Sequence, residues 1–345
     1  MKETLSIGTA SAKPRTKGTG FVRVANRPDG SEIGIPIMIV NGADDGAVIV
    51  ADAGVHGDEF EGMEAIRRVA DALDPNRLRG AFVGIPCLNV LAFEAGFRSS
   101  HIDWLNLNRV FPGRAPGTGF VTENIAYAFE HEIMAPTKDL TKCYVTFHGG
   151  GTGAGGIQAI GPCVPYDEGT SSVDQKSAEL AKIFGIDLLV TAIGGWPPNG
   201  TGDSTAIATK LGIPSVCPEV GGEARLSEEL IEIDVRGLDN LMTYFDMIDG
   251  QLKLPESWTW VAGPVTCCTK GGFWRASVKV RQNVSKGDLI GTTISYFGDI
   301  VEIFESPHDG IVCCLRSTAS VYPGEWYGLV GSVKRIFRRE DLKVG

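Results

Sequence analysis

The chain has 345 residues, about twice a typical domain of ~150, which predicts one large or two unequal domains. Hydrophobic residues make up 43% and charged residues 21%, which excludes a disordered chain. The formal net charge of −10 repels phosphate backbones and anionic lipid heads, so we expect no nucleic-acid and no membrane partner. No stretch approaches the ~20 apolar residues of a membrane-spanning helix.

The predicted elements alternate between strands and helices for most of the chain. Short alternating segments at 20–24 and 35–40 predict an antiparallel β segment at the start. The pattern that follows predicts an α/β fold, a mostly parallel or mixed sheet with helices on both faces. We expect buried strands at 47–53, 81–86, 143–147, 187–193 and 213–218, and helices at 59–73, 122–134, 174–184, 204–211 and 227–248, with Thr122 and Ser227 as N-caps.

The residue pattern changes after about residue 251. Pro255 and Gly263-Pro264 suggest a linker, and no long helical period follows it. Residues 256–345 carry eleven basic and nine acidic side chains, against 21 and 33 in the first 255. We therefore expect a β segment at 1–45 packed on an α/β domain at 46–255, and a small all-β domain at 256–345.

The eight cysteines form no Cys-x-x-Cys pair, and most lie in apolar runs, where cysteine behaves as a small buried hydrophobe. The N-terminus lacks the apolar core of a secretion signal. A cytoplasmic protein with reduced thiols is the expectation.

Polar side chains follow three of the expected buried strands. In open parallel sheets, ligands bind at the carboxyl ends of the strands. His56 and Glu59 follow the first strand within a glycine-flanked turn, His148 follows another strand and precedes three glycines, and Glu219 follows a third. Two of the five histidines in the chain thus occupy such edges.

Two imidazoles and one carboxylate can bind Zn²⁺ and leave a fourth position for water or substrate. Bound zinc lowers the pKa of its water to ~7 and polarises a carbonyl, which suits amide hydrolysis. Glu219 is then a candidate general base, and Asp58 a candidate supporting residue. The alternative is that these groups are ordinary hydrogen-bonded turn residues. No comparable group of polar residues accompanies His101, His131 and His308. We expect these three to be surface or structural residues.

Arg98 and the segment Asn106-Leu107-Asn108-Arg109 form a polar, loop-like stretch. A guanidinium binds a carboxylate in bidentate fashion or stabilises an oxyanion. The alternative is that both arginines pair with surface acids. Two weaker features are Gly200 to Ser204, either an anion-binding turn or a plain helix cap, and Trp196-Pro197-Pro198, either a lid or an ordinary loop.

Four motifs in this order resemble the succinylglutamate desuccinylase/aspartoacylase family, within the zinc-carboxypeptidase-like group. They are HGDE at 56–59, NLNRVFPG at 106–113, His148 and Glu219, and the likeness covers roughly residues 45–250. It is greatest for the branch that removes acetyl groups from N-acetylated diamino acids such as N-acetyl-diaminobutyrate. The resemblance implies one Zn²⁺ per chain held by His56, Glu59 and His148, a water activated by Glu219, a carbonyl oxygen stabilised by Arg98, and a substrate site lined by Asn108 and Arg109.

The chain departs from the family pattern at two positions. Asn106 and Thr146 stand where the family usually has Asp. Both differences remove negative charge near the expected metal, which bears on substrate choice and metal affinity, whereas the inferred ligands and base remain.

The segment after residue 255 resembles a biotinyl/lipoyl-type β hammerhead, through 284–291 and 306–312. Residues 287–333 contain no lysine, which excludes covalent attachment of biotin or lipoate there. We interpret this part as a packing or oligomerisation module that shapes access to the zinc site. Its β edges favour a homo-oligomer.

The resulting hypothesis is a zinc-dependent deacylase that hydrolyses the amide bond of a small N-acyl amino acid. The alternatives are a zinc carboxypeptidase acting on peptides and a catalytically degenerate relative that binds a ligand.

Overall fold

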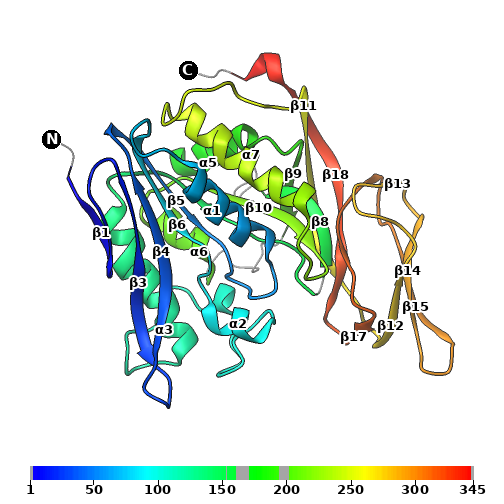
Figure 1. Cartoon of the computed structure of the whole chain (residues 1–345). Helices are drawn as coiled ribbons and strands as arrows, with labels where there is room; N and C mark the ends of the chain where they lie inside the picture. The colour runs from blue at the N-terminus through cyan, green and yellow to red at the C-terminus, as the bar shows by residue number, and fades with distance from the viewer. Residues whose placement is uncertain (1–2, 153, 161–170, 194–201, 343–345) are drawn as a thin grey trace.

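The computed structural model describes residues 3–152, 154–160, 171–193 and 202–342 (Figure 1). The strands are β1 (Leu5–Ile7), β2 (Ala10–Ala12), β3 (Thr16–Asn26), β4 (Glu32–Asn41), β5 (Asp44–Asp52), β6 (Arg79–Ile85), β7 (Thr141–Thr146), β8 (Ala154–Ile160), β9 (Leu188–Ile193), β10 (Ser215–Gly222), β11 (Ser257–Cys267), β12 (Gly272–Ala276), β13 (Asn283–Val284), β14 (Leu289–Ile294), β15 (Ile300–Glu305), β16 (Gly310–Arg316), β17 (Ser320–Val321) and β18 (Trp326–Arg338). The helices are α1 (Glu61–Ala72), α2 (Val90–Ala95), α3 (Val121–Ala128), α4 (Ala135–Thr137), α5 (Ser172–Phe184), α6 (Ser204–Lys210) and α7 (Glu228–Tyr244), with short helices η1 (Leu107–Arg109), η2 (Phe129–Met134) and η3 (Arg339–Asp341).

A twelve-stranded mixed sheet runs through the molecule in the order β13-β16-β18-β11-β9-β8-β10-β7-β5-β6-β4-β3. Strands β10, β7, β5 and β6 are parallel to one another, and the β3–β4 hairpin joins β6 in antiparallel fashion. The predicted mixed α/β fold with an antiparallel start is therefore confirmed.

Helices cover both faces of the sheet, as predicted (Figure 1). Successive side chains of a strand point to opposite faces. In β5, Val48 and Val50 belong to the apolar cluster that includes residues of α3 and α6. Ile49 and Ala51 belong to a second cluster, which includes residues of α1, α5 and α7. The run of apolar residues in β5 is thus explained by burial on both sides.

The helix expected at 122–134 differs at both ends. It begins at Val121 with Phe120 as the N-cap, while the N–H and Oγ1 of Thr122 donate to Asp103. Thr122 is therefore not the cap. The helix continues as the π-helix η2 and then as α4. Ser227 does occupy the N-cap position of α7, without a side-chain cap bond.

The prediction of a linker around Gly263-Pro264 is wrong, because β11 runs through both residues. Gly263 and Pro264 pair with Ala192 and Ile193 of the parallel strand β9. Strand β10 also runs past its predicted end at 218 to Gly222, because β8, a strand that the sequence did not predict, pairs with it.

Strands from the last ninety residues extend the central sheet. Strand β11 pairs parallel with β9, and β16 pairs antiparallel with β8. A separate four-stranded sheet has the order β15-β14-β12-β17. The hammerhead likeness and the division into domains stay predictions. Every helix within the described ranges is too short or too polar to span a bilayer.

Candidate metal centre

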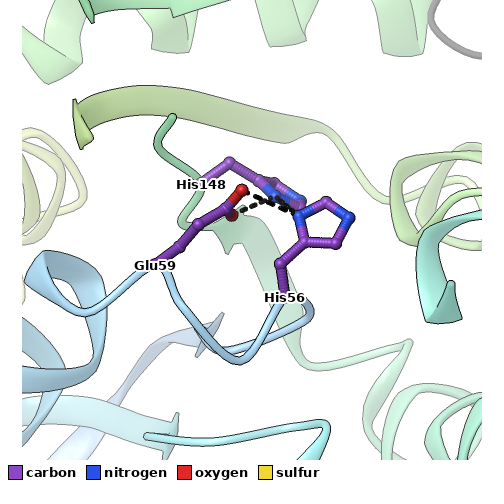
Figure 2. Close-up of side chains that lie close together, drawn as sticks. All are labelled: His56, Glu59 and His148. Atoms are coloured by element: carbon purple, nitrogen blue, oxygen red, sulfur yellow. Dashed lines mark hydrogen bonds and ion pairs between the residues drawn. The ribbon is translucent and has the colours of Figure 1, made fainter. Parts of the chain in front are cut away.

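His56 and Glu59 lie in the turn that connects β5 to α1. Their side chains point toward that of His148 (Figure 2). Gly57 lies between them and packs tightly against the backbone of α2, since a Cβ there would be 2.0 Å from the carbonyl carbon of Ala92. A glycine at this place allows the turn to approach α2 closely.

His148 follows β7 and lies beside Glu219 of β10. The N–H of His148 donates to the carbonyl of Pro218 at 2.9 Å, and the N–H of Val220 donates to the carbonyl of His148 at 2.8 Å. His148 and Glu219 are therefore parallel bridge partners. The two residues thus lie side by side in the sheet, as the sequence predicts.

The side chains of His56, Glu59 and His148 converge on one point (Figure 2). Nδ1 of His56 is 2.9 Å from Oε1 of Glu59, and Nδ1 of His148 is 2.9 Å from Oε2. The two Nδ1 atoms are 3.3 Å apart. All three residues are buried. Within the described ranges, they form the one group of three or more His, Cys, Asp and Glu side chains that could hold a metal.

This donor set fits a divalent metal. Two imidazole nitrogens and one carboxylate are the ligands of many three-ligand zinc sites. Burial lowers the pKa of His56 to about 3, so its ring is neutral at pH 7, the form that binds metals. Burial also disfavours protonation of His148, but its hydrogen bond and ion pair with Glu59 outweigh it and raise the pKa of His148. A cation bound between these groups would replace that proton.

Arg98 lies beyond α2 and binds one of the candidate ligands. Its Nη1 donates to Oε1 of Glu59 at 2.9 Å. The side chain is 30% exposed, so the guanidinium reaches from the solvent side into the centre. Its predicted role at a reacting carbonyl stays a prediction.

Asn106, Asn108 and Arg109 belong to one turn that borders the centre. Asn106 is the N-cap of η1, and its Oδ1 lies 3.1 Å from Nε2 of His56. Asn108 is buried, and its Oδ1 accepts a hydrogen bond from the N–H of Ser204 at 3.4 Å. Arg109 is exposed, and its Nη1 donates to the carbonyl of Asn108 at 2.7 Å. The predicted substrate-binding pair therefore belongs to the same turn as Asn106, which contacts the candidate ligand His56.

Glu219 is partly buried, and its surroundings favour a proton acceptor. Desolvation raises the pKa of Glu219 to about 7, and the negative charge of Glu59 adds to it. The positive charges of His148, Arg98 and Arg109 oppose this shift. A carboxyl with a pKa near 7 can accept and return a proton at neutral pH.

The sequence did not predict the buried carboxyl group of Asp52, which interacts electrostatically with His148. Asp52, the last residue of β5, accepts hydrogen bonds from the Tyr144 hydroxyl at 2.5 Å and the Thr146 hydroxyl at 2.8 Å. Burial raises the pKa of Asp52 to about 6, against these two hydrogen bonds. The available signal was an acidic residue inside an apolar strand.

The remaining candidates have structural partners. Oδ2 of Asp58 accepts from the N–H and the hydroxyl of Thr152, both at 2.9 Å, so it anchors the loop after His148. Asp203 caps α6 by accepting from the N–H of Ala206, which favours the plain cap at this place. Gly200, Thr201 and the segment 196–198 lie outside the described residues. His101, His131 and His308 do not belong to the centre, as expected.

Residues 45–245 match the model of the succinylglutamate desuccinylase/aspartoacylase catalytic domain. The chain belongs to this family. The predicted family is thereby confirmed, and membership indicates hydrolysis of an amide bond in an N-acyl amino acid. Over 324 residues, or 91% of each chain, the protein is 27% identical to the N-alpha-acetyl-L-2,4-diaminobutyric acid deacetylase of Halomonas elongata.

Solved structures of this family share the fold. The product-bound ectoine utilization protein EutE (DoeB) of Ruegeria pomeroyi superposes with a TM-score of 0.80 at 23% identity, over 92% of this chain and 94% of that one. A succinylglutamate desuccinylase/aspartoacylase of Rhodobacter sphaeroides has a TM-score of 0.79 at 22% identity, over 92% and 96%. Both matches thus cover more than nine tenths of the chain.

Proposed function

We propose that the protein is a zinc-dependent deacylase that hydrolyses the amide bond of a small N-acyl amino acid, with an N-acetylated diamino acid as the favoured substrate. One observation carries this proposal: His56, Glu59 and His148 converge on one point, and Glu219 lies on the strand beside His148. The name of the Halomonas relative supports the substrate class.

When bound, zinc supplies a Lewis acid for the acyl carbonyl and lowers the pKa of a coordinated water. Glu219 takes the proton of the attacking water, and its pKa of about 7 keeps a large fraction of it unprotonated at neutral pH. The same carboxyl then returns the proton to the departing amine. Arg98, which already contacts Glu59, stabilises negative charge that develops on the carbonyl oxygen.

Asn108 and Arg109 bind the amino-acid part of the substrate. Arg109 lies in the turn that also carries the His56 contact, and a guanidinium binds a carboxylate in bidentate fashion. Asn108 is held in place by Ser204 and offers polar groups beside it. A free amino acid derivative, with its exposed carboxylate, matches this pair of side chains.

The test is a substrate panel with the zinc-loaded protein. We expect release of acetate from N-acetylated diamino acids, slower hydrolysis of N-acyl acidic amino acids, and little cleavage of dipeptides. The Glu219→Gln variant serves as the blank. Rapid dipeptide cleavage without deacylation would instead identify a carboxypeptidase, and stoichiometric zinc without any turnover would identify a ligand-binding relative.

The proposal includes one zinc ion per chain, a cytoplasmic location and a homo-oligomeric state. Cys87, Cys143, Cys267, Cys268, Cys313 and Cys314 form no disulfide with one another, which agrees with a reducing compartment. Metal analysis and light scattering test the zinc content and the assembly directly.

A further inference from the structure

The side-chain oxygen of Asn106 accepts two hydrogen bonds at the border of the metal centre. The N–H of Asn108 donates to Oδ1 at 2.9 Å, and the same oxygen lies 3.1 Å from Nε2 of His56. A backbone N–H can only donate, so the Asn106 atom that it meets is the oxygen and not the amide nitrogen. Nε2 of His56 therefore carries the hydrogen of this contact.

This hydrogen bond decides which nitrogen of His56 is free. A neutral imidazole has one N–H, so a hydrogen on Nε2 leaves the lone pair on Nδ1. Nδ1 is the atom that faces Oε1 of Glu59 at 2.9 Å and Nδ1 of His148 at 3.3 Å. The hydrogen bond to Asn106 thus selects the His56 tautomer in which the lone pair of Nδ1 points into the centre.

The acceptor at Asn106 has no charge. A carboxylate in its place would attract the Nε2 hydrogen more strongly and make His56 a stronger electron donor to a metal. Glu59, the anionic member of the centre, also shares Oε1 with Arg98, which withdraws part of its negative charge. Arg98 therefore weakens Glu59 as a ligand, and Asn106 supports His56 less strongly than a carboxylate would.

We propose that Asn106 is a positioning residue that holds His56 in the metal-binding tautomer and, because its amide is uncharged, keeps the zinc affinity of the centre below that of a carboxylate-supported one. Zinc binding by His56 is taken from the proposed function, whereas the identity of the substrate is not needed.

The test compares zinc affinities of metal-free variants by competition with a chromophoric chelator. Asn106→Asp keeps the size of the side chain and adds the charge, so we expect zinc to bind at least ~10-fold more tightly. Asn106→Ala removes the acceptor and should weaken binding by about 10- to 100-fold. Asn283→Asp adds the same charge at an exposed position of β13 and should leave the affinity unchanged.

A second readout follows the tautomer itself. In the zinc-loaded protein with ¹⁵N-labelled histidine, the His56 ring should carry its hydrogen on Nε2. A hydrogen on Nδ1 would overturn the proposal, as would an affinity of Asn106→Asp equal to that of the unaltered protein. Failure of the unaltered protein to bind zinc would overturn it too. An inactive substrate panel combined with the expected affinities would reject the proposed function and leave the role of Asn106 standing.

Thermal unfolding of the metal-free variants separates misfolding from lost affinity. If Asn106→Ala does not fold, the zinc affinity of Asn106→Asp still tests the proposal, since this variant retains an acceptor for both hydrogen bonds.

Discussion

His148 and Glu219 are bridge partners on neighbouring parallel segments, joined by the hydrogen bonds of His148 to Pro218 and of Val220 to His148. One residue is a candidate metal ligand and the other a candidate base. Their separation is therefore fixed by the strand spacing of the sheet, ~4.8 Å, rather than by the conformation of a loop. Glu219 therefore stays beside His148 in every conformation that preserves the sheet.

The first prediction concerns Glu219→Gln. The amide is similar in size to the carboxylate but cannot accept a proton, so we expect the rate of hydrolysis to fall at least ~100-fold. Zinc content should stay near that of the unaltered protein, because Glu219 is not one of the three converging side chains. Glu229→Gln, an exposed change in the first turn of α7, is the matched control. Unchanged turnover in Glu219→Gln would remove Glu219 from the mechanism.

The pH dependence of the reaction is the second prediction. Glu219 must be unprotonated to accept a proton, and desolvation raises its pKa to about 7. Activity should therefore rise with pH and level off above this pKa, falling about tenfold for each pH unit below it. A bound cation adds positive charge, so the midpoint of kcat/KM in the zinc enzyme should lie at or below pH 7. An acid limb above pH 8 would contradict the assignment.

Gly57→Ala tests the packing of the ligand turn. The added Cβ would meet the backbone of Ala92 at 2.0 Å, which forces the turn away from α2. Overpacking of this kind costs ~1–3 kcal/mol, and displacement of His56 should also weaken zinc binding. Urea denaturation and the chelator assay measure the two effects.

Gly212→Ala is the control for this glycine. It has a φ of +78° and nothing within 4 Å of an added Cβ, so it carries backbone strain alone. We expect a loss of stability without a change in zinc affinity. If both variants bound zinc equally well, the close packing of Gly57 would have no bearing on the centre.

Asp234→Asn tests the pH dependence of folding. Asp234 of α7 is fully buried, and among the described residues neither of its carboxyl oxygens has a hydrogen-bond partner. Desolvation, with a further contribution from Glu61, raises the pKa of Asp234 well above its usual value of 3.8. The folded state therefore keeps its proton while the unfolded state loses it, and this contribution to stability declines as the pH rises above about 3.8.

An asparagine does not titrate, so the variant should match the unaltered protein near pH 3.5 and become the more stable of the two toward pH 7. We expect a difference of more than ~1 kcal/mol at pH 7, in guanidinium denaturation curves recorded across this range. Asp45→Asn, at an exposed position, should show no such trend. Parallel stability curves for Asp234→Asn and the unaltered protein would refute the prediction.

The sequence predicted the centre because its signals are local. His56, His148 and Glu219 each follow an apolar strand, and parallel strands end at a common edge. The contact between Asp52 and Thr146 could not be predicted in this way, because it depends on the register of β5 against β7. The same holds for Asn106 and His56, which are fifty residues apart.

Two errors in the predicted elements have a similar origin. Gly263-Pro264 suggests a break when the residues are considered alone, but both residues pair with β9, and β11 continues through them. The glycine-rich segment Ala154–Ile160 has weak strand propensity, and its pairing with β10 and β16 makes it β8.

The single hydrogen-bonded sheet that contains both β10 and β18 has a consequence for engineering the protein. A truncation after residue 255 would remove β11 from β9 and β16 from β8. The strand edges left unpaired would favour aggregation. The last ninety residues therefore cannot be exchanged between proteins as an independent module. Chimeras between relatives should instead exchange surface turns, while all twelve strands come from one parent.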